Sequence, residues 1–235
     1  MRQALPSLSP HRIDVSFTGV TERLLHGHHA FRKRAGTEGD YLKRLALEGQ
    51  KPTALFIGCS DSRVIPEWLT GSSPGELFVV RNIANHVPHA DNADSSVGAA
   101  IDYAVGVLQV ADIVVCGHTG CGGIRAALNG VDALPPKHDS LREWVGNIVP
   151  AIRSAVDGGH EGEALMDRSV EENVLTSLDN LITYGAVAER IADASIGLHA
   201  WVYDLGTLAL RVYDADTGHW ADARTLIAPS SRLLP

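Results

Sequence analysis

Two short segments of the chain contain side chains that are able to bind a metal ion together. Cys59 follows the apolar run 54–57. His118 and Cys121 follow a second apolar run at 113–116. Short β-branched runs of this kind are typical of buried parallel strands, and ligands bind beyond the carboxyl ends of such strands, so neighbouring strands would bring the three side chains to one point. Two thiolates and one imidazole suit Zn²⁺, and three protein ligands leave a fourth position open, as in catalytic zinc sites.

The pattern around these segments alternates between strands and helices. Further strands are predicted at 77–80, 196–203 and 208–213, and helices at 95–108 and 120–128. Strands joined by helices pair in parallel, whereas the short connection before the last strand favours an antiparallel hairpin. The sequence therefore predicts an α/β fold, with a central, mainly parallel sheet of four strands plus an antiparallel edge strand, flanked by helices.

Three local predictions concern helices outside this core. A helix is expected at 15–34, a break at 36–40 and a second short helix at 41–48. His26, His28 and His29 favour a polar helix face over a metal site, because no cysteine or carboxylate is spaced to complete a ligand set. Ser169, followed three residues later by Glu172, has the spacing of a capping box and predicts that a helix begins there.

Composition limits the class of protein. With 235 residues, 45% hydrophobic and 20% charged, the chain suits a single globular domain, 1–235, with an N-terminal arm or helix at 1–35 and a C-terminal tail at 218–235. A net charge of −8 argues against nucleic-acid binding. No apolar run approaches the roughly 20 residues that cross a membrane, and a signal peptide is not expected. Three cysteines, two of them in the segments above, favour metal binding in a reducing compartment, so we expect a cytoplasmic protein.

Asp61 and Arg63 form a second group beside Cys59. The guanidinium can pair with the carboxylate, keep it ionised and direct it toward a metal, although such a pair on an open surface would stabilise little. Two other chemistries stay open. One is a phosphatase with Cys59 as nucleophile, which is the weaker alternative because the loop is too short to surround a phosphate with backbone amides. The other is a Cys-His hydrolase. Cys116 lies inside a strand and is assigned to the core.

Three motifs together resemble the β class of carbonic anhydrases. They are Cys-Ser-Asp-Ser-Arg at 59–63, Gly-Glu-Leu-Phe-Val-Val-Arg-Asn-Ile-Ala-Asn at 75–85, and Gly-His-Thr-Gly-Cys-Gly-Gly at 117–123. The resemblance is strong from about Gln50 to Ile124 and weaker at 198–205. These motifs are long, and no unrelated family is known to us to share the set.

The resemblance implies a role for each matching residue. It implies one zinc ion per chain, bound by the residues at 59, 118 and 121, and a catalytic dyad of Asp61 and Arg63. It also implies that Gln50, Phe78 and Tyr103 bind substrate, as in the plant-like subgroup. The family's bicarbonate-regulated subgroup has a tryptophan where this chain has Phe56, although Gly58 and Tyr203 match that subgroup. An unregulated, open zinc site is therefore expected.

The implied activity is that of a zinc lyase, the reversible hydration of carbon dioxide to bicarbonate and a proton. The resemblance also implies a homodimer or homotetramer, with no nucleic-acid or membrane partner. Two alternatives stay open. One is a related hydrolase of carbon disulfide or carbonyl sulfide with the same zinc chemistry, and the other is a non-catalytic, zinc-stabilised binding module with a closed fourth ligand.

Overall fold

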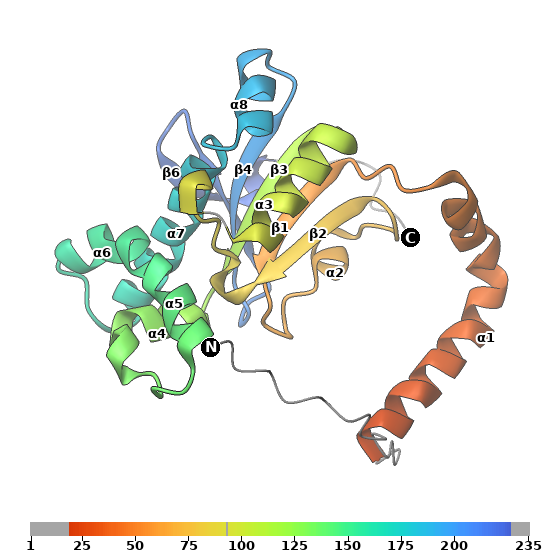
Figure 1. Ribbon diagram of the computed structural model, residues 1–235, viewed down its shortest axis with the longest axis horizontal. Coiled ribbons are helices and arrows are strands. Elements are labelled where there is room, and N and C mark those ends of the chain that lie inside the picture. The colour runs from red at the N-terminus through yellow and green to blue at the C-terminus, as the bar shows by residue number, and fades with distance from the viewer. Residues whose placement is uncertain (1–18, 93, 227–235) are drawn as a thin grey trace, which may run out of the picture. The chain divides into compact units, whose positions relative to one another are not determined.

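The computed structural model describes residues 19–92 and 94–226. Residues 1–18 of the predicted arm and 227–235 of the predicted tail lie outside the described residues. The chain divides into two compact units, residues 1–49 and residues 50–235 (Figure 1). In the part of the chain that is described, no helix combines the length and the apolar character needed to cross a membrane.

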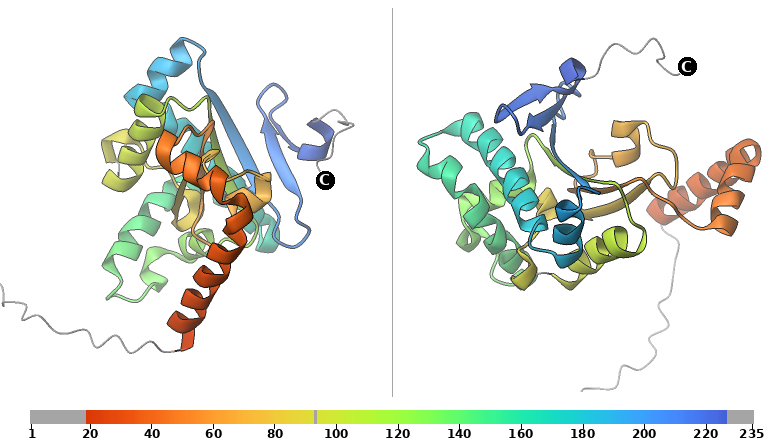
Figure 2. Two further views of the ribbon diagram at one scale, coloured as in Figure 1. Left: turned by 90° about the vertical axis from the view of Figure 1, so that its right-hand side faces the viewer. Right: turned by 90° about the horizontal axis from the view of Figure 1, so that it is seen from above.

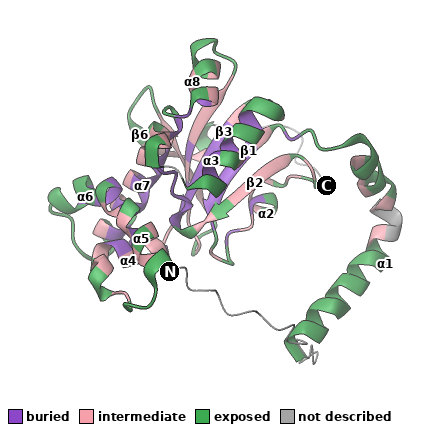
Figure 3. Ribbon diagram, in the orientation of Figure 1, coloured by how far each residue is buried: buried purple, intermediate pink, exposed green. Residues whose placement is uncertain are grey.

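The described part of the first unit is one long helix, α1 (Gly19–Glu48). The predicted break at 36–40 is wrong, because the helix continues through Gly36 and Gly39. A single glycine costs a helix only about 1 kcal/mol, which is too little to end one. Most of α1 is exposed along its length, including the large apolar side chains of Leu24 and Phe31 (Figure 3).

In the described part of the second unit, a six-stranded sheet has the strand order β2-β1-β3-β4-β5-β6. The strands are β1 (Ala54–Cys59), β2 (Leu77–Asn82), β3 (Asp112–His118), β4 (Gly197–Tyr203), β5 (Leu210–Asp214) and β6 (His219–Asp222). The first four are parallel, and β5 and β6 are antiparallel. The predicted α/β class is confirmed. The sequence analysis missed β6, because four residues are too few to show the alternation of a strand.

Helices cover both faces of the sheet. They are α2 (Pro66–Thr70), α3 (Ser95–Asp102) with the π-helix η3 (Tyr103–Val107), α4 (Gly122–Asn129), α5 (Asp139–Ile148), α6 (Arg153–Asp157), α7 (Gly162–Leu181), α8 (Gly185–Ala192) and α9 (Ala223–Leu226), with 3₁₀ turns η1 (Ile83–Asn85), η2 (Ala90–Asn92), η4 (Val131–Ala133) and η5 (Val149–Ile152). The right-hand view of Figure 2 shows α3, α7 and α8 along one face and α2 on the other.

The helix starts show where local signals succeeded and failed. Asp94 caps α3 at the start of the helix predicted at 95–108, since its Oδ1 accepts from the backbone N–H groups of Ser96 at 2.9 Å and Val97 at 3.3 Å. The capping box at Ser169 is wrong, because Ser169 is fully buried inside α7, which begins at Gly162. Serine and glutamate three residues apart also fit a helix interior, so the motif alone does not locate a helix end.

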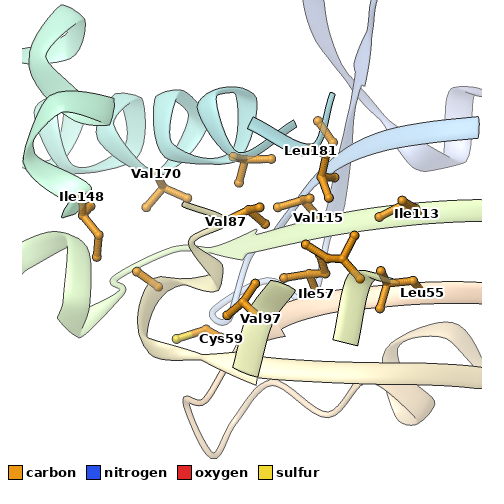
Figure 4. Close-up of a cluster of buried hydrophobic side chains, with 14 of the residues drawn as sticks. Leu55, Ile57, Cys59, Val87, Val97, Ile113, Val115, Ile148, Val170 and Leu181 are labelled. Atoms are coloured by element: carbon orange, nitrogen blue, oxygen red, sulfur yellow. The ribbon is translucent and has the colours of Figure 1, made fainter. Parts of the chain in front are cut away.

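The larger core lies between the sheet and α3 and α7. Leu55 and Ile57 of β1 face Val97 of α3, and Cys59 continues the same row at the end of the strand (Figure 4). Because strand side chains alternate between faces, Cys116 of β3 lies in a smaller cluster on the opposite face. Cys116 is fully buried, and this burial raises the pKa of its thiol to about 12. The assignment of Cys116 to the core is confirmed.

Candidate metal centre and active site

Cys59, His118 and Cys121 converge at the carboxyl ends of two neighbouring strands. Cys59 is the last residue of β1, His118 is the last residue of β3, and Cys121 is the N-cap of α4. Their two Sγ atoms and one ring nitrogen all lie within 4.8 Å of one another, and all three residues are buried. The parallel pairing of β1 with β3 therefore brings together the three predicted ligands, which are 62 residues apart at most.

The hydrogen bonding of His118 fits a metal ligand. Its Nδ1 lies 3.0 Å from the carbonyl oxygen of Thr119, so Nδ1 carries the proton and Nε2 keeps a free lone pair. Nε2 is buried and has no hydrogen-bond partner among the described residues. A buried lone pair facing two thiols is costly unless a cation lies between them. The donor set of two sulfurs and one imidazole nitrogen fits Zn²⁺.

The two thiols influence each other strongly. Their Sγ atoms are 3.9 Å apart. The pKa of Cys59 is lowered to about 4, chiefly by its hydrogen bond with Cys121, and the same contact is the main reason why the pKa of Cys121 is raised. Without a bound cation, two thiolates at this distance repel each other. A bound divalent cation removes the conflict, because it binds both sulfurs as thiolates.

Asp61 and Arg63 form the predicted pair in the loop after β1. The backbone N–H and Nε of Arg63 donate to Asp61 Oδ1 at 3.0 and 2.9 Å, and Nη2 donates to Oδ2 at 2.8 Å. This guanidinium holds the pKa of the Asp61 carboxyl well below its usual range. Asp61 Oδ2 lies 4.0 Å from His118 Nε2, so the ionised carboxylate borders the ligand group.

The sequence analysis missed Arg81, which supports the same loop. Its Nε donates to the carbonyl oxygen of Cys59 at 3.0 Å, and its Nη2 donates to that of Asp61 at 2.6 Å. In the register of β1 and β2, Arg81 lies opposite Gly58. An arginine directly after the apolar run 77–80 was the available signal, because its guanidinium carries several donors close to the strand end.

Gln50, Phe78 and Tyr103 are not brought to this centre within one chain. Phe78 is paired in register with Leu55, four residues before Cys59, which places it about 13 Å along the strand from the ligand end. Gln50 precedes the same far end of β1. The rings of Phe78 and Tyr103 are in contact, with centroids 5.8 Å apart, and Tyr103 is 44% exposed.

A cleft of about 650 Å³ begins beside the metal centre. It reaches Ser60, the residue after Cys59, and extends past Asn82 to Trp144 of α5. The described residues that line it include none of the three predicted substrate-binding residues. Within one chain, the cleft beside the centre and the Phe78–Tyr103 pair are therefore separate surfaces.

Phe56 stands where the resemblance places a tryptophan in the bicarbonate-regulated subgroup. Its side chain is buried, and its ring meets Trp201 edge-on with centroids 6.3 Å apart. A Cβ on Gly58 would lie only 2.9 Å from Phe56 Cε1. The phenylalanine ring therefore fills the space beside Gly58.

The arrangement can be compared with known proteins. A family model described as carbonic anhydrase matches residues 54–210. A carbonic anhydrase of Synechocystis sp. is 36% identical, covering 90% of this chain and 76% of that protein, and one of Pseudomonas aeruginosa is 40% identical, covering 77% and 82%. The solved structure of the β-carbonic anhydrase CcaA has a TM-score of 0.82 at 35% identity, covering 86% of this chain and 99% of that one.

A second solved structure bears on assembly. The report on two tetrameric β-carbonic anhydrases of Sordaria macrospora includes a chain with a TM-score of 0.71 at 28% identity, covering 88% of this chain and 98% of that one. Similarity in sequence and in fold thus extends over most of the chain. The chain belongs to the carbonic anhydrase family, in its β class.

Proposed function

We propose that this carbonic anhydrase acts at the centre formed by Cys59, His118 and Cys121, with Asp61 and Arg63 as its catalytic dyad. Zinc-dependent, reversible hydration of carbon dioxide to bicarbonate and a proton is the activity of its family. The observation that supports these residue roles is the position of the dyad. Asp61 is held by Arg63 and borders the ligand group at 4.0 Å from His118 Nε2.

Each member of the dyad has a defined task. Zinc, when bound, is a Lewis acid that lowers the pKa of water and so supplies hydroxide near neutral pH. Asp61 stays ionised beside Arg63, so it can only accept a hydrogen bond. It would accept a hydrogen bond from the attacking hydroxide. This orientation leaves an oxygen lone pair directed at the carbon of carbon dioxide. Arg63 keeps both carboxylate oxygens oriented, which lowers the entropic cost of this arrangement.

We assign the chain to the open-site, plant-like subgroup. Both oxygens of Asp61 accept hydrogen bonds from Arg63. Within the described part of the chain, the group of ligand atoms lying within 4.8 Å of one another does not include Asp61. The ring of Phe56 fills the space beside Gly58. These contacts support a fourth position that is free for water, without regulation by bicarbonate.

We further propose that a second copy of this chain completes the substrate wall with Gln50, Phe78 and Tyr103. These residues lie at the opposite end of β1 and β2 from their own metal centre. Tyr103 is 44% exposed and in contact with Phe78, so an aromatic surface is available to a partner. A homodimer or homotetramer would supply such a wall, and the Sordaria macrospora relatives are described as tetrameric.

The proposed organisation is a single catalytic domain that carries an N-terminal helical arm. The family model matches residues 54–210, which lie entirely in the second unit. We also propose a cytoplasmic location. All three cysteines are free, and the zinc-binding thiols at 59 and 121 would persist best in a reducing compartment.

A stopped-flow assay of carbon dioxide hydration, with zinc counted per chain, tests the proposed function. We expect one zinc ion per chain, and turnover that is lost on dialysis against a chelator and restored by zinc. Parallel assays use carbonyl sulfide and carbon disulfide. Faster hydrolysis of either gas than hydration of carbon dioxide would favour the related hydrolase. One bound zinc with no turnover on any of the three substrates would favour the binding module.

A further inference from the structure

The segment after β2 contains a left-handed turn that packs against both ends of the loop containing His118 and Cys121. Ala84 and Asn85 have φ angles of 63° and 48°, a region that non-glycine residues rarely adopt. A Cβ on Gly123 would lie 3.0 Å from Ala84 Cβ, and a Cβ on Gly117 would lie 3.8 Å from Asn85 Oδ1. Gly117 directly precedes one zinc ligand, and Gly123 follows another by two positions. The turn therefore contacts the backbone beside both ligands.

One side chain of α7 holds this turn from both sides. Asn173 is 1% exposed. Its Nδ2 donates to the carbonyl oxygen of Ala84 at 2.8 Å, and its Oδ1 accepts from Nδ1 of His86 at 3.1 Å. Donor and acceptor are thus both used, and the two contacts flank Asn85. A buried amide that is satisfied in this way fixes the geometry of the backbone it binds.

The neighbouring polar residues of α7 bind farther along the same segment. Ser177 Oγ accepts from the N–H of Val87 at 3.1 Å, and Asn180 Nδ2 donates to the carbonyl oxygen of Val87 at 2.8 Å. The positions 173, 177 and 180 follow the spacing of one helix face. Of these three side chains, Asn173 is the one that binds Ala84, the residue in contact with Gly123.

We propose that Asn173 is a positioning residue for the zinc centre. By holding the Ala84–Asn85 turn, it keeps the backbone around His118 and Cys121 in the arrangement that retains the metal. Without its Nδ2 donor, the buried carbonyl of Ala84 loses its partner and the left-handed turn can relax away from the loop containing His118 and Cys121. Asn173 acts only through the turn. The inference rests on the proposed centre, so its test includes a separate check of that centre.

The experiment compares two matched variants. Asn173→Leu keeps the number and branching of the side-chain heavy atoms and removes both hydrogen bonds, and Asn180→Leu removes the same type of contact from Val87. The rate at which the purified holoenzyme transfers zinc to a chromogenic chelator is measured, together with the visible absorption spectrum of the cobalt-substituted protein. We expect Asn173→Leu to release zinc about tenfold faster and to change the cobalt spectrum. Asn180→Leu should unfold at a lower temperature than the wild type but keep the wild-type rate of zinc release and the wild-type cobalt spectrum.

Wild-type release and an unchanged cobalt spectrum in Asn173→Leu would overturn the proposal, as would equal changes in Asn180→Leu. If Asn173→Leu does not fold, Asn173→Asp serves in its place. It keeps the shape and the acceptor for His86 but presents an oxygen to the carbonyl of Ala84, so faster release is again expected and unchanged release overturns the role. A Cys121→Ser variant that still binds one zinc ion with wild-type affinity would instead show that the proposed centre is wrong.

Discussion

The same Asp-x-Arg arrangement occurs at two places in the described part of the chain. Arg224 binds Asp222 as Arg63 binds Asp61, with its backbone N–H and Nε on Oδ1 and its Nη2 on Oδ2. Both arginine side chains are largely exposed, but Asp61 is 18% exposed and borders the ligand group, whereas Asp222 is 32% exposed at the antiparallel edge. Exposed pairs stabilise little, so only the first pair is placed to affect chemistry.

The dyad can be tested with the second pair as its control. Arg63→Ala removes the donors that orient Asp61, whose Oδ2 is already 4.0 Å from His118 Nε2. The released carboxylate can then turn toward the proposed fourth zinc position. We expect kcat/KM for carbon dioxide hydration to fall about 10- to 100-fold with zinc retained. Arg224→Ala, which breaks the matching pair, should leave kcat/KM unchanged. A fully active Arg63→Ala enzyme would contradict the proposed role.

His86 makes the stability of the fold dependent on pH. It is buried against Asn173 and Trp144, and burial lowers its pKa. As pH falls below the ordinary value of about 6.5, the unfolded chain binds this proton before the folded one does. The histidine therefore contributes a loss of stability as pH falls from about 6.5. Urea unfolding midpoints across pH 5 to 8 should show this slope, and the slope should be shallower in His86→Gln. Equal slopes would contradict the assignment.

The contact between α7 and β3 is unusually close beside the zinc centre. A Cβ on Gly117 would lie 2.7 Å from Val174 Cγ2 and 3.0 Å from Val170 Cγ1. Only glycine at this position lets the two valines of α7 approach the strand. This approach also allows Asn173, on the same helix, to reach the turn that contacts the loop containing His118 and Cys121. Helix packing and the metal site therefore depend on one backbone position.

We expect Gly117→Ala to destabilise the protein by about 1–3 kcal/mol, because the added methyl group forces α7 away from β3. The matched control is Gly185→Ala in α8, where an added Cβ meets nothing within 4 Å. Alanine there should be neutral or stabilising by less than about 1 kcal/mol. The melting temperatures of the two variants are compared in thermal unfolding. Equal melting temperatures would show that the added methyl group at position 117 is accommodated without loss of stability.

In the proposed composite site, a second copy of the chain is needed to complete the active site. The proposed zinc ligands lie at one end of β1 and β3, and the Phe78–Tyr103 pair lies toward the other end of the same sheet. A rigid strand cannot bring its two ends to one substrate. A symmetric partner could, because a two-fold interface that joins the far end of one chain to the near end of the other makes the reciprocal contact as well.

Mixing two inactive variants tests this composite site. One chain carries Cys121→Ser, and the other carries Gln50→Ala together with Tyr103→Ala. In a mixed dimer, one of the two sites combines an intact zinc centre with an intact wall, so random mixing should restore about a quarter of the wild-type activity. Mass spectrometry of differently tagged chains verifies that mixed dimers form. Mixed dimers without recovered activity would place the wall elsewhere.

Local sequence was sufficient to predict that Cys59, His118 and Cys121 meet and that Asp61 pairs with Arg63. The apolar runs before Cys59, His118 and Cys121 are typical of buried strands, so the positions of these side chains at strand ends could be predicted. Asp61 and Arg63 are two positions apart, which is close enough to pair in any fold. The α/β class could be read in the same way, because each strand and helix has its own period. Local signals failed at Gly36 and Ser169, where the packing or length of a helix outweighed the preference of one residue.

Contacts between distant segments lay beyond such patterns. The support from Arg81 and Asn173 depends on which backbone groups the fold leaves next to these side chains. The separation of Phe78 and Tyr103 from the metal centre depends on strand register, which is set by pairing and not by composition. Residue chemistry could thus be inferred one segment at a time, whereas the position of each residue relative to the zinc centre required the assembled sheet.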